Sequence, residues 1–266
     1  MKKTLAVLVA LMMTLVALSA LAEGTFRVGM ECNYAPFNWT QADAGDFTVA
    51  IEGGGGYADG YDVQIAQKIA DGLGKELVIV KTEWDGLPMG VVSNAFDAII
   101  AGMSPTEERK VTLDFSDSYY TSDLVVVVKK DSAYADAKVL ADLSGATITG
   151  QLNTFHYSVI GQIPDVKIGI AMDTFPAMIV ALQSGAIDGY VAERPGAEAD
   201  TMANPDLTYI LFEDGFAASE EDVSIAVGLQ KGSPLAAEIN QILAELDQET
   251  RVQMMLDATA RQPLSE

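Results

Sequence analysis

Two ten-residue segments of this chain, residues 92–101 and 183–192, follow nearly the same pattern 91 positions apart. The first reads Val-Ser-Asn-Ala-Phe-Asp-Ala-Ile-Ile-Ala, and the second reads Gln-Ser-Gly-Ala-Ile-Asp-Gly-Tyr-Val-Ala. Each copy has the pattern of a helix end, an Asn or Gly stop, a short bend and an apolar strand. A repeated αβ unit predicts two similar lobes. Since ligands of open α/β sheets bind beyond the carboxyl ends of the strands, the residues after each copy are the first candidates for a site.

The first copy leads into Ser104-Pro105-Thr106-Glu107, which predicts a helix start capped by Ser104 or, for a slightly later helix, by Thr106. Free N–H groups at such a start favour an anion. Arg109 lies one turn into this helix and can bind a carboxylate through two parallel hydrogen bonds. The alternative is a surface arginine that pairs with its charged neighbours.

The second copy is followed directly by Glu193, whose carboxylate can bind an ammonium group. The alternatives are an ion pair with Arg194 and a solvated loop acid. With Arg109 on one lobe and Glu193 on the other, the chain predicts a site for a zwitterion between the lobes. Gln151-Leu152-Asn153-Thr154-Phe155 follows another predicted strand and starts a helix, so its free N–H groups and the Thr154 hydroxyl should face the same cleft.

Aromatic residues accompany these charges. We expect Tyr34 and Trp84, in loops after strand ends, to enclose an aliphatic part of the ligand and to exclude water from the charged contacts. Phe37, nearby in sequence, is expected to pack in the core. Glu31 follows the first strand and is expected either to meet a ligand's ammonium or polar side chain or to be a solvated loop acid.

The hydrophobic pattern predicts an α/β fold, in which a β-α-β-α-β order near the start gives a parallel sheet with right-handed crossovers. Residues 40–58 contain Gly53-Gly54-Gly55-Gly56 and are expected to be a flexible loop; no Lys-Ser/Thr and helix follow, as a phosphate cradle would need. We expect strands at 25–30, 77–81, 96–101, 124–128, 146–149, 167–170, 187–192, 207–212 and 223–229, and helices at 62–73, 87–92, from 154, 175–183, 234–246 and 249–258.

Residues 1–22 have the three parts of a secretory signal peptide: the basic pair Lys2 and Lys3, an apolar run, and Ala20-Leu21-Ala22 as a cleavage signal. A retained membrane anchor is the alternative, for which the apolar run is short. No cysteine follows the run, so we expect no lipid anchor. The expected location is the periplasm, after cleavage near Ala22.

Without Lys2 and Lys3, 14 Lys and Arg face 38 Asp and Glu, a net charge near −24. Such acidity disfavours nucleic acid and anionic lipid as partners and favours solubility. Cys32 is the single cysteine, so no internal disulfide can form. We expect a monomer with no cofactor, no metal and no catalytic residues.

Several motifs together resemble the extracellular solute-binding proteins of polar amino-acid ABC transporters, family 3, over essentially all of the mature chain. They are Gly60-Tyr61-Asp62-Val63-Gln64-Ile65-Ala66, Trp84-Asp85-Gly86-Leu87, residues 96–104, Glu108-Arg109-Lys110 and Asp114-Phe115-Ser116-Asp117-Ser118-Tyr119-Tyr120. The resemblance implies a periplasmic-binding-protein-like fold of type II. In that fold each lobe is a mixed sheet flanked by helices, a two-strand hinge joins the lobes, and they close on an amino acid that is delivered to a membrane permease.

The resemblance also implies roles for single residues. Arg109 would grip the α-carboxylate with help from Gly102 and Ser104, and Glu193 falls where an Asp usually binds the α-ammonium. Tyr34 and Trp84 fall at aromatic clamp positions, and Thr154 and Phe155 fall at the anion loop of the second lobe. Three features depart from the family: Asn153 replaces a usual Gly, although Asn tolerates left-handed backbone; Glu193 is one methylene longer than Asp; and the 40–58 loop is longer than usual.

The expected domains are a signal peptide at 1–22, a first lobe of 23–118 plus 222–266, and a second lobe of 124–212. Hinge crossings are expected at 119–123 and 213–221, although a single crossing also fits the sequence. The C-terminal helices should pack on the first lobe.

The interpretation is a binding protein for an amino acid with a polar or basic side chain, because Glu31 is acidic and the cleft has no second assigned arginine. The alternatives are an enzyme on the same scaffold, such as a cyclohexadienyl-dehydratase-like protein, and an amino-acid-sensing domain. An enzyme needs a positioned acid or base; the chain has one histidine, His156, and Glu31 and Glu193 could also serve.

Overall fold

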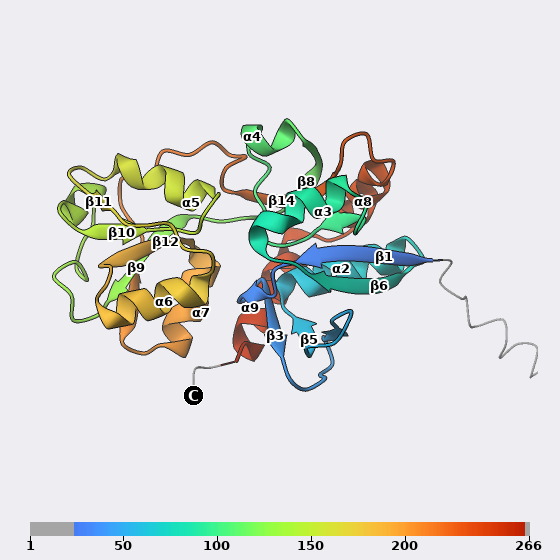
Figure 1. Cartoon of the computed structure of the whole chain (residues 1–266), viewed down its shortest axis with the longest axis horizontal. Helices are drawn as coiled ribbons and strands as arrows, with labels where there is room; N and C mark the ends of the chain where they lie inside the picture. The colour runs from blue at the N-terminus through green and yellow to red at the C-terminus, as the bar shows by residue number, and fades with distance from the viewer. Residues whose placement is uncertain (1–23, 264–266) are drawn as a thin grey trace, which may run out of the picture.

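The computed structural model describes residues 24–263, so the expected signal peptide lies outside the described residues. The described chain forms two mixed sheets flanked by helices, which lie side by side in Figure 1, and a smaller third sheet. The predicted two-lobed α/β fold is confirmed.

The first sheet has the strand order β6-β1-β7-β14-β8. Strand β1 pairs in parallel with β6 and β7, as the β-α-β-α-β order predicts, whereas β14 runs antiparallel to β7 and β8. The bounds are β1 (Thr25–Met30), β6 (Glu76–Lys81), β7 (Ala98–Ile99), β8 (Leu113–Thr121) and β14 (Ser224–Gln230). The nine-residue strand β8 was not predicted.

The second sheet has the order β11-β10-β12-β9-β13 and the same sequence of parallel and antiparallel neighbours. The bounds are β9 (Leu124–Lys129), β10 (Thr147–Thr149), β11 (Lys167–Ile168), β12 (Gly189–Glu193) and β13 (Leu207–Ile210). The chain passes from β8 directly to β9 and returns from β13 to β14, so it runs between the sheets twice within the described residues.

The repeated sequence folds as a repeated structure. One copy joins α3 (Leu87–Val92) to β7, and the other joins α6 (Phe175–Ser184) to β12. All ten matched positions have the same burial class in the two copies. Asn94 and Gly185 end their helices with φ of 59° and 78°, the left-handed backbone that the sequence predicts for the two stops.

Each copy also anchors the neighbouring strand through its aspartate. Asp97 Oδ2 accepts a hydrogen bond from the Arg27 backbone N–H at 2.8 Å, and Asp188 Oδ2 accepts one from the Thr147 backbone N–H at 2.8 Å. Arg27 and Thr147 lie at matched places on β1 and β10, each the second strand in the order of its sheet. The shared aspartate therefore has the same structural role in both lobes.

The third sheet corrects the expectation of a flexible loop at 40–58. Its order is β2-β3-β5-β4, with β2 (Asn33–Tyr34), β3 (Asn38–Gln41), β4 (Val49–Ala50) and β5 (Tyr57–Asp59). Contacts distant in sequence hold it: Ile51 is buried and bridges Ile79 of β6, and Glu52 forms an ion pair with Arg27 at 2.6 Å. The glycine run 53–56 is the turn between β4 and β5.

The remaining helices are α2 (Tyr61–Gly72), α4 (Glu107–Lys110), α5 (Phe155–Ser158), α7 (Arg194–Ala203), α8 (Leu235–Ala244) and α9 (Gln248–Arg261). Short 3₁₀ turns occupy Trp84–Gly86, Leu140–Leu143 and Val159–Gln162. Helix α7 was not predicted, although Pro195 in its first turn is a helix-start signal.

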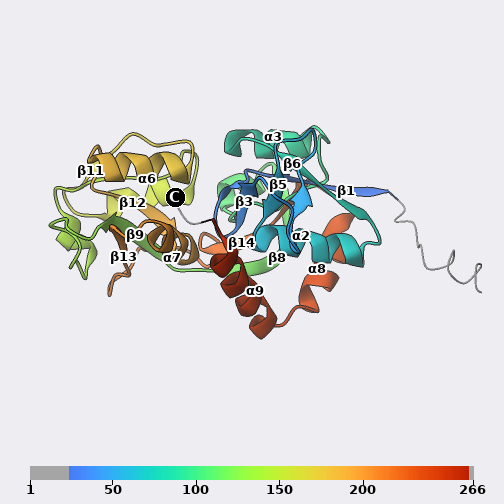
Figure 2. The same ribbon diagram turned by 90° about the horizontal axis from the view of Figure 1, so that it is seen from below.

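The C-terminal helices contact both lobes. Helix α8 packs on β8 and α2 as expected, but α9 contacts both α2 and α7. Just after α9, the Gln262 side chain donates a hydrogen bond to the Ala199 carbonyl oxygen on α7 at 2.8 Å. Figure 2 shows α9 between the two groups of elements. This segment therefore connects the lobes in addition to the two strand crossings.

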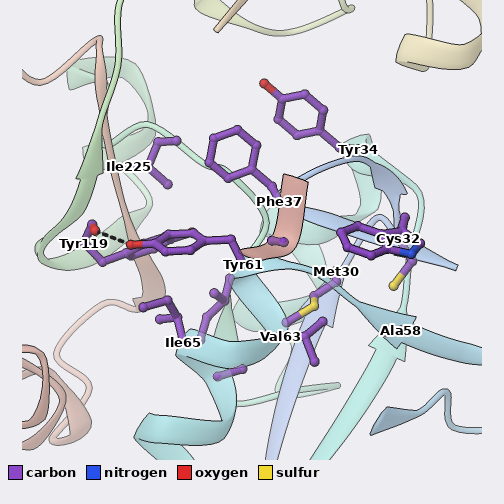
Figure 3. Packing of buried hydrophobic residues seen from close by; sticks show 14 of the residues in the cluster. Met30, Cys32, Tyr34, Phe37, Ala58, Tyr61, Val63, Ile65, Tyr119 and Ile225 are labelled. Atoms are coloured by element: carbon purple, nitrogen blue, oxygen red, sulfur yellow. Dashed lines mark hydrogen bonds between the residues drawn. The ribbon is translucent and has the colours of Figure 1, made fainter. Parts of the chain in front are cut away.

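An aromatic core lies under the third sheet (Figure 3). The Tyr61 hydroxyl, on α2, donates a hydrogen bond to the Tyr119 carbonyl oxygen at 2.9 Å. Phe37 is fully buried against Tyr61 and Tyr34, which confirms its predicted core position. Figure 3 shows Tyr34 at the edge of this cluster, with its hydroxyl pointing away from Tyr61.

Between residues 24 and 263, every helix is too short or too polar to cross a lipid bilayer.

Candidate functional site

A small cavity lies where the segments after β7 and β12 face each other. Its volume is about 10 Å³, room for roughly one water molecule. Every residue predicted for the site lines it except Glu31, which reaches it through Gln151. The lining residues are Tyr34, Trp84, Ala101, Gly102, Ser104, Arg109, Gln151, Thr154, Phe155, His156 and Glu193.

Arg109 folds back from α4 and connects the two lobes. Its Nη1 donates a hydrogen bond to the Ser104 carbonyl oxygen at 2.9 Å, and its Nη2 donates to the Asn153 carbonyl oxygen at 3.0 Å. The guanidinium carbon lies 5.1 Å from the centroid of the Trp84 ring, a cation–π distance. Burial lowers the pKa of Arg109 to about 10, partly offset by the charge of Glu193, so the guanidinium remains positive at neutral pH.

Glu193 ends β12 and is 3% exposed. Its Oε2 accepts hydrogen bonds from the Tyr34 hydroxyl, which comes from the other lobe, and from His156 Nε2 at 2.9 Å. Burial alone would raise the pKa of Glu193, but the charge of His156 and these hydrogen bonds together hold it below its ordinary value. Neither alternative for Glu193 fits, because it is not solvated and Arg194 pairs with Glu198 at 2.8 Å.

Glu31 is buried as well, at 2% exposure, so the alternative of a solvated loop acid is wrong. Gln151 Nε2 donates hydrogen bonds to Glu31 Oε2 at 3.1 Å and to the Asp173 carbonyl oxygen at 2.9 Å. Burial raises the pKa of Glu31 to about 7, against the opposing effect of the Gln151 hydrogen bond. Within residues 24–263, Glu31 Oε1 has no hydrogen-bond partner. This oxygen can accept a hydrogen bond from a donor on a ligand.

Aromatic rings enclose the cavity from both lobes. The Tyr34 ring stacks between Phe37 and Phe175, with centroid distances of 4.9 Å and 4.2 Å. Phe175 is the first residue of α6, and no sequence pattern assigned it to the site. Trp84 lies under Arg109. These rings shield the charged groups from water, which strengthens electrostatic contacts between them.

The predicted helix starts are present but short. Thr106, and not Ser104, caps α4: its hydroxyl accepts a hydrogen bond from the Arg109 backbone N–H at 3.4 Å, while Ser104 contributes its carbonyl oxygen to the Arg109 guanidinium. Helices α4 and α5 each have one turn. A single turn has a small dipole, so anion binding here depends on Arg109 more than on the helix ends.

The second-lobe loop has the backbone that the sequence predicts. Asn153 has φ of 55°, in the left-handed region that Asn tolerates. Its side chain donates a hydrogen bond to Asp85 of the other lobe at 2.9 Å. The Thr154 hydroxyl lies in the cavity wall and donates to the Gln151 carbonyl oxygen at 2.6 Å.

Asp62 supports the site from behind. This buried acid on α2 accepts hydrogen bonds from the Tyr119 hydroxyl and Asn38 Nδ2, both at 2.7 Å, and from the Gly102 backbone. Burial raises its pKa to about 6, partly offset by these donors. Gly102 has φ of 63°, and a Cβ there would lie 3.0 Å from the Tyr34 ring. The loop after β7 is thereby held against Tyr34.

His156 and Asp62 are the polar residues of the site that the sequence patterns did not predict. The sequence suggests His156 only as a possible catalytic base, although it directly follows the Thr154-Phe155 segment that is assigned to the cleft. Asp62 lies in the first turn of α2, next to its apolar face, and no local sequence pattern predicts that an acid there is buried.

Two similar sheets and a cleft with a guanidinium on one side and a carboxylate on the other define a two-lobed ligand-binding protein. Residues 26–258 match the model of the bacterial extracellular solute-binding proteins, family 3. The chain therefore belongs to this family, and its relatives are substrate-binding proteins and not enzymes.

Three individual proteins illustrate this similarity. The chain is 28% identical to the arginine-binding extracellular protein ArtP of Bacillus subtilis over 223 residues, 83% of this chain and 80% of ArtP. It is 28% identical to the L-cystine-binding protein TcyJ of Escherichia coli K12 over 233 residues, 87% and 81% of the two chains. A Streptococcus pneumoniae amino acid ABC transporter substrate-binding protein bound to L-arginine superimposes with a TM-score of 0.76 at 26% identity, covering 90% of this chain and 95% of that one.

Proposed function

We propose that this protein binds a free amino acid between its lobes, outside the cytoplasmic membrane, and delivers it to the permease of an ABC transporter. One observation carries the proposal: Arg109 and Glu193, from opposite lobes, line the same cavity. They match the carboxylate and the ammonium of an α-amino acid. Relatives named for binding arginine and L-cystine support this reading.

The other lining residues complete the proposed contacts. Gly102, Ser104 and Thr154 would add hydrogen bonds around the α-carboxylate near Arg109. Tyr34, Trp84 and Phe155 would cover the aliphatic part of the ligand and exclude water. Micromolar affinity needs about 8 kcal/mol of net binding free energy. Two buried charge-assisted contacts supply a large part of it.

We propose a polar or basic side chain on the ligand. Glu31 has a free Oε1, and its Oε2 is held by Gln151, which lines the cavity. An ammonium, guanidinium or amide group could donate to Glu31. The arginine found with the S. pneumoniae protein has this chemistry.

Binding requires the lobes to separate, because a cavity of about 10 Å³ is far smaller than an amino acid. We propose that 119–123 and 213–221 form the hinge between a first lobe of 23–118 plus 222–266 and a second lobe of 124–212. The ligand would stabilise a closed form, and the permease would bind that form.

The proposed location is the periplasm. The signal peptide at 1–22 would be removed near Ala22, and with no cysteine at the cleavage site the mature protein would carry no lipid anchor. We propose that it acts as a monomer with no cofactor and meets the permease as its protein partner.

Isothermal titration calorimetry of the mature protein against the twenty amino acids, ornithine and cystine tests this function. We expect micromolar binding of at least one polar or basic amino acid, and loss of that binding in Arg109→Ala. The matched control is Arg194→Ala, which removes a half-exposed arginine that pairs with Glu198. Absence of binding to every compound, or unchanged affinity in Arg109→Ala, contradicts the proposal.

A further inference from the structure

The buried carboxylate of Glu193 already has a hydrogen-bond partner from its own lobe, the His156 imidazole. His156 Nε2 lies 2.9 Å from Glu193 Oε2, and the two residues are 8% and 3% exposed. Arg109, the other positive group of the cavity, donates instead to the backbone oxygens of Ser104 and Asn153. Within the described part of the chain, His156 is the basic side chain that contacts the Glu193 carboxylate.

Few other ionisable groups surround His156. The adjoining 3₁₀ turn Val159–Gln162 contributes none, and the neighbouring α6 presents the edge of the uncharged Phe175 ring. The ionisable side chains of the packed elements are Tyr157 on α5, Tyr190 and Glu193 on β12, Tyr34 on β2 and Arg109 on α4, with Glu31 beyond Gln151 and Asp200 beyond Tyr190. Of these groups, Glu193 is the acid that contacts the imidazole.

The second ring nitrogen of His156 forms no hydrogen bond that would compete with the contact to Glu193 among the described residues. Its Nδ1 is buried and has no hydrogen-bond partner among residues 24–263. A protonated Nδ1 therefore gains no hydrogen bond from the described residues, and a buried donor without an acceptor is unfavourable. A protonated His156 would depend on Glu193 for a compensating negative charge. The charged carboxylate of Glu193 would likewise be very unfavourable in this buried position without a partner.

An amino acid would change this balance of charge. Its carboxylate neutralises Arg109 and its α-ammonium neutralises Glu193, so a protonated His156 would be left as an uncompensated buried charge. A cation buried without a partner is strongly unfavourable. The imidazole can avoid that cost by losing one ring proton to the solvent.

We propose that His156 is a positioning residue that holds Glu193 as an imidazolium, and that the α-ammonium of the ligand replaces it with release of one proton. This inference rests on the proposed function and adds a linkage between amino-acid affinity and pH. Because binding and proton release are reciprocal, acid should weaken binding. The affinity should rise by up to about tenfold per pH unit over the range in which His156 loses its proton in the protein alone.

His156 is the single histidine of the chain. In protein without a histidine tag, its imidazole protonation can therefore be followed without signals from other histidines. With L-arginine as the probe, calorimetry at pH 6 in buffers of different ionisation enthalpy counts the protons released. We expect about one more proton per bound ligand for the wild type than for His156→Gln, and a weaker pH dependence of affinity in that variant. In NMR spectra, the single imidazole should change from the charged to the neutral form on binding.

Two controls separate other sources of protons. Glu31→Gln removes the other buried acid near the cavity, which can lose a proton to the solvent when the cationic side chain of L-arginine binds beside it. In the complex of this variant with L-arginine, the His156 change should remain. The probe 5-guanidinopentanoate, which is arginine without its α-amine, should leave the imidazole charged. If the wild type and His156→Gln release equal numbers of protons, or if the imidazole keeps its charge with L-arginine, the inference is wrong.

The outcomes also separate this inference from the proposed function. If L-arginine or another amino acid binds without a change at His156, the function stands and the inference fails. If no amino acid binds at pH 6 or pH 8, both fail. The NMR measurement uses the wild-type protein, so the test holds even where His156→Gln does not fold.

Discussion

The two lobes share one αβ unit and differ in the segment that comes after it. Residues 92–101 and 183–192 have the same burial class at each position, and Asp97 and Asp188 each bind the neighbouring strand, β1 or β10, through a hydrogen bond of 2.8 Å. After β7 the chain turns at Gly102 into a loop that carries Arg109. After β12 it ends in Glu193 and enters α7. The repeated part is scaffold, and the opposite charges of the site come from the segments just beyond it.

A second pair of regions shows how local donors adjust a buried acid. Asp62 in the first lobe and Asp200 in the second each accept a hydrogen bond from a tyrosine, at 2.7 Å from Tyr119 and 2.6 Å from Tyr190. Burial raises the pKa of both, to about 6 for Asp62, which has two further donors, and to about 7 for Asp200. A larger number of hydrogen-bond donors stabilises the charged form of a buried acid and therefore lowers its pKa.

The largest effect on ligand binding should come from the difference in charge between the lobes. Glu193→Gln keeps the size of the side chain and removes the charge that faces Arg109. We expect amino-acid affinity to fall by more than about 100-fold, about 3 kcal/mol, because the ligand ammonium and His156 both lose their buried partner. Calorimetry measures this. The control Glu198→Gln, an acid of α7 that pairs with Arg194, should bind nearly as well as the wild type; equal losses in both variants contradict the assignment.

The buried acids should differ in how they couple stability to pH. The folded pKa of Asp200 is raised to about 7, so the folded protein keeps its proton at pH values where the unfolded chain has lost it. Its stabilising effect is complete below about pH 4 and is lost as the pH rises through about 7. Asp200→Asn should remove this decline in stability, on the order of 4 kcal/mol for a rise of roughly three pKa units at about 1.4 kcal/mol per unit.

Urea unfolding at several pH values between 4 and 8 checks the expectation for Asp200. Asp62→Asn is the matched variant and should remove a smaller decline, which ends near pH 6. Curves for Asp200→Asn that run parallel to those of the wild type would show that this acid is charged in the folded protein at lower pH than we expect.

The shared aspartates should give equal effects in the two lobes. Asp97→Ala and Asp188→Ala each leave one strand N–H without its acceptor, and we expect each to lower the free energy of unfolding by about 1–2 kcal/mol. Chemical denaturation measures both. Asp136→Ala, at an exposed loop position, is the control and should change little. A large inequality between the two variants would mean that the repeat is a similarity of sequence more than of structure.

The smallest effect should come from the two helix stops. Gly185 has φ of 78° and a Cβ there would meet nothing closer than 3.9 Å, so Gly185→Ala adds backbone strain without a clash. We expect a loss of about 1 kcal/mol. Asn94→Gly should be neutral within about 0.5 kcal/mol, because Asn and Gly both tolerate this backbone. Thermal unfolding compares them, and a neutral Gly185→Ala would show that the left-handed backbone there carries no strain.

Patterns local in sequence predicted most of the elements. The apolar period of residues 62–73 predicted α2, and the five apolar residues from Leu124 predicted the buried strand β9. The repeat predicted the matched lobes. The sequence patterns did not predict β8, whose burial does not alternate cleanly, or α7, although Pro195 in the first turn of α7 is a helix-start signal. Strand ends such as those of β7 depend on hydrogen bonds to neighbours, which a local pattern does not contain.

Residues within a turn or two of one another are enough to specify the repeated αβ units, their helix stops and the positions of Arg109 and Glu193 after the two copies. Contacts between distant segments required the folded chain: Tyr34 and Glu193, 159 positions apart, bond across the cleft, Gln151 holds Glu31, and His156 pairs with Glu193. Such contacts depend on how two sheets come together. Hydrophobic burial drives that packing without regard to sequence distance, so no local pattern encodes it.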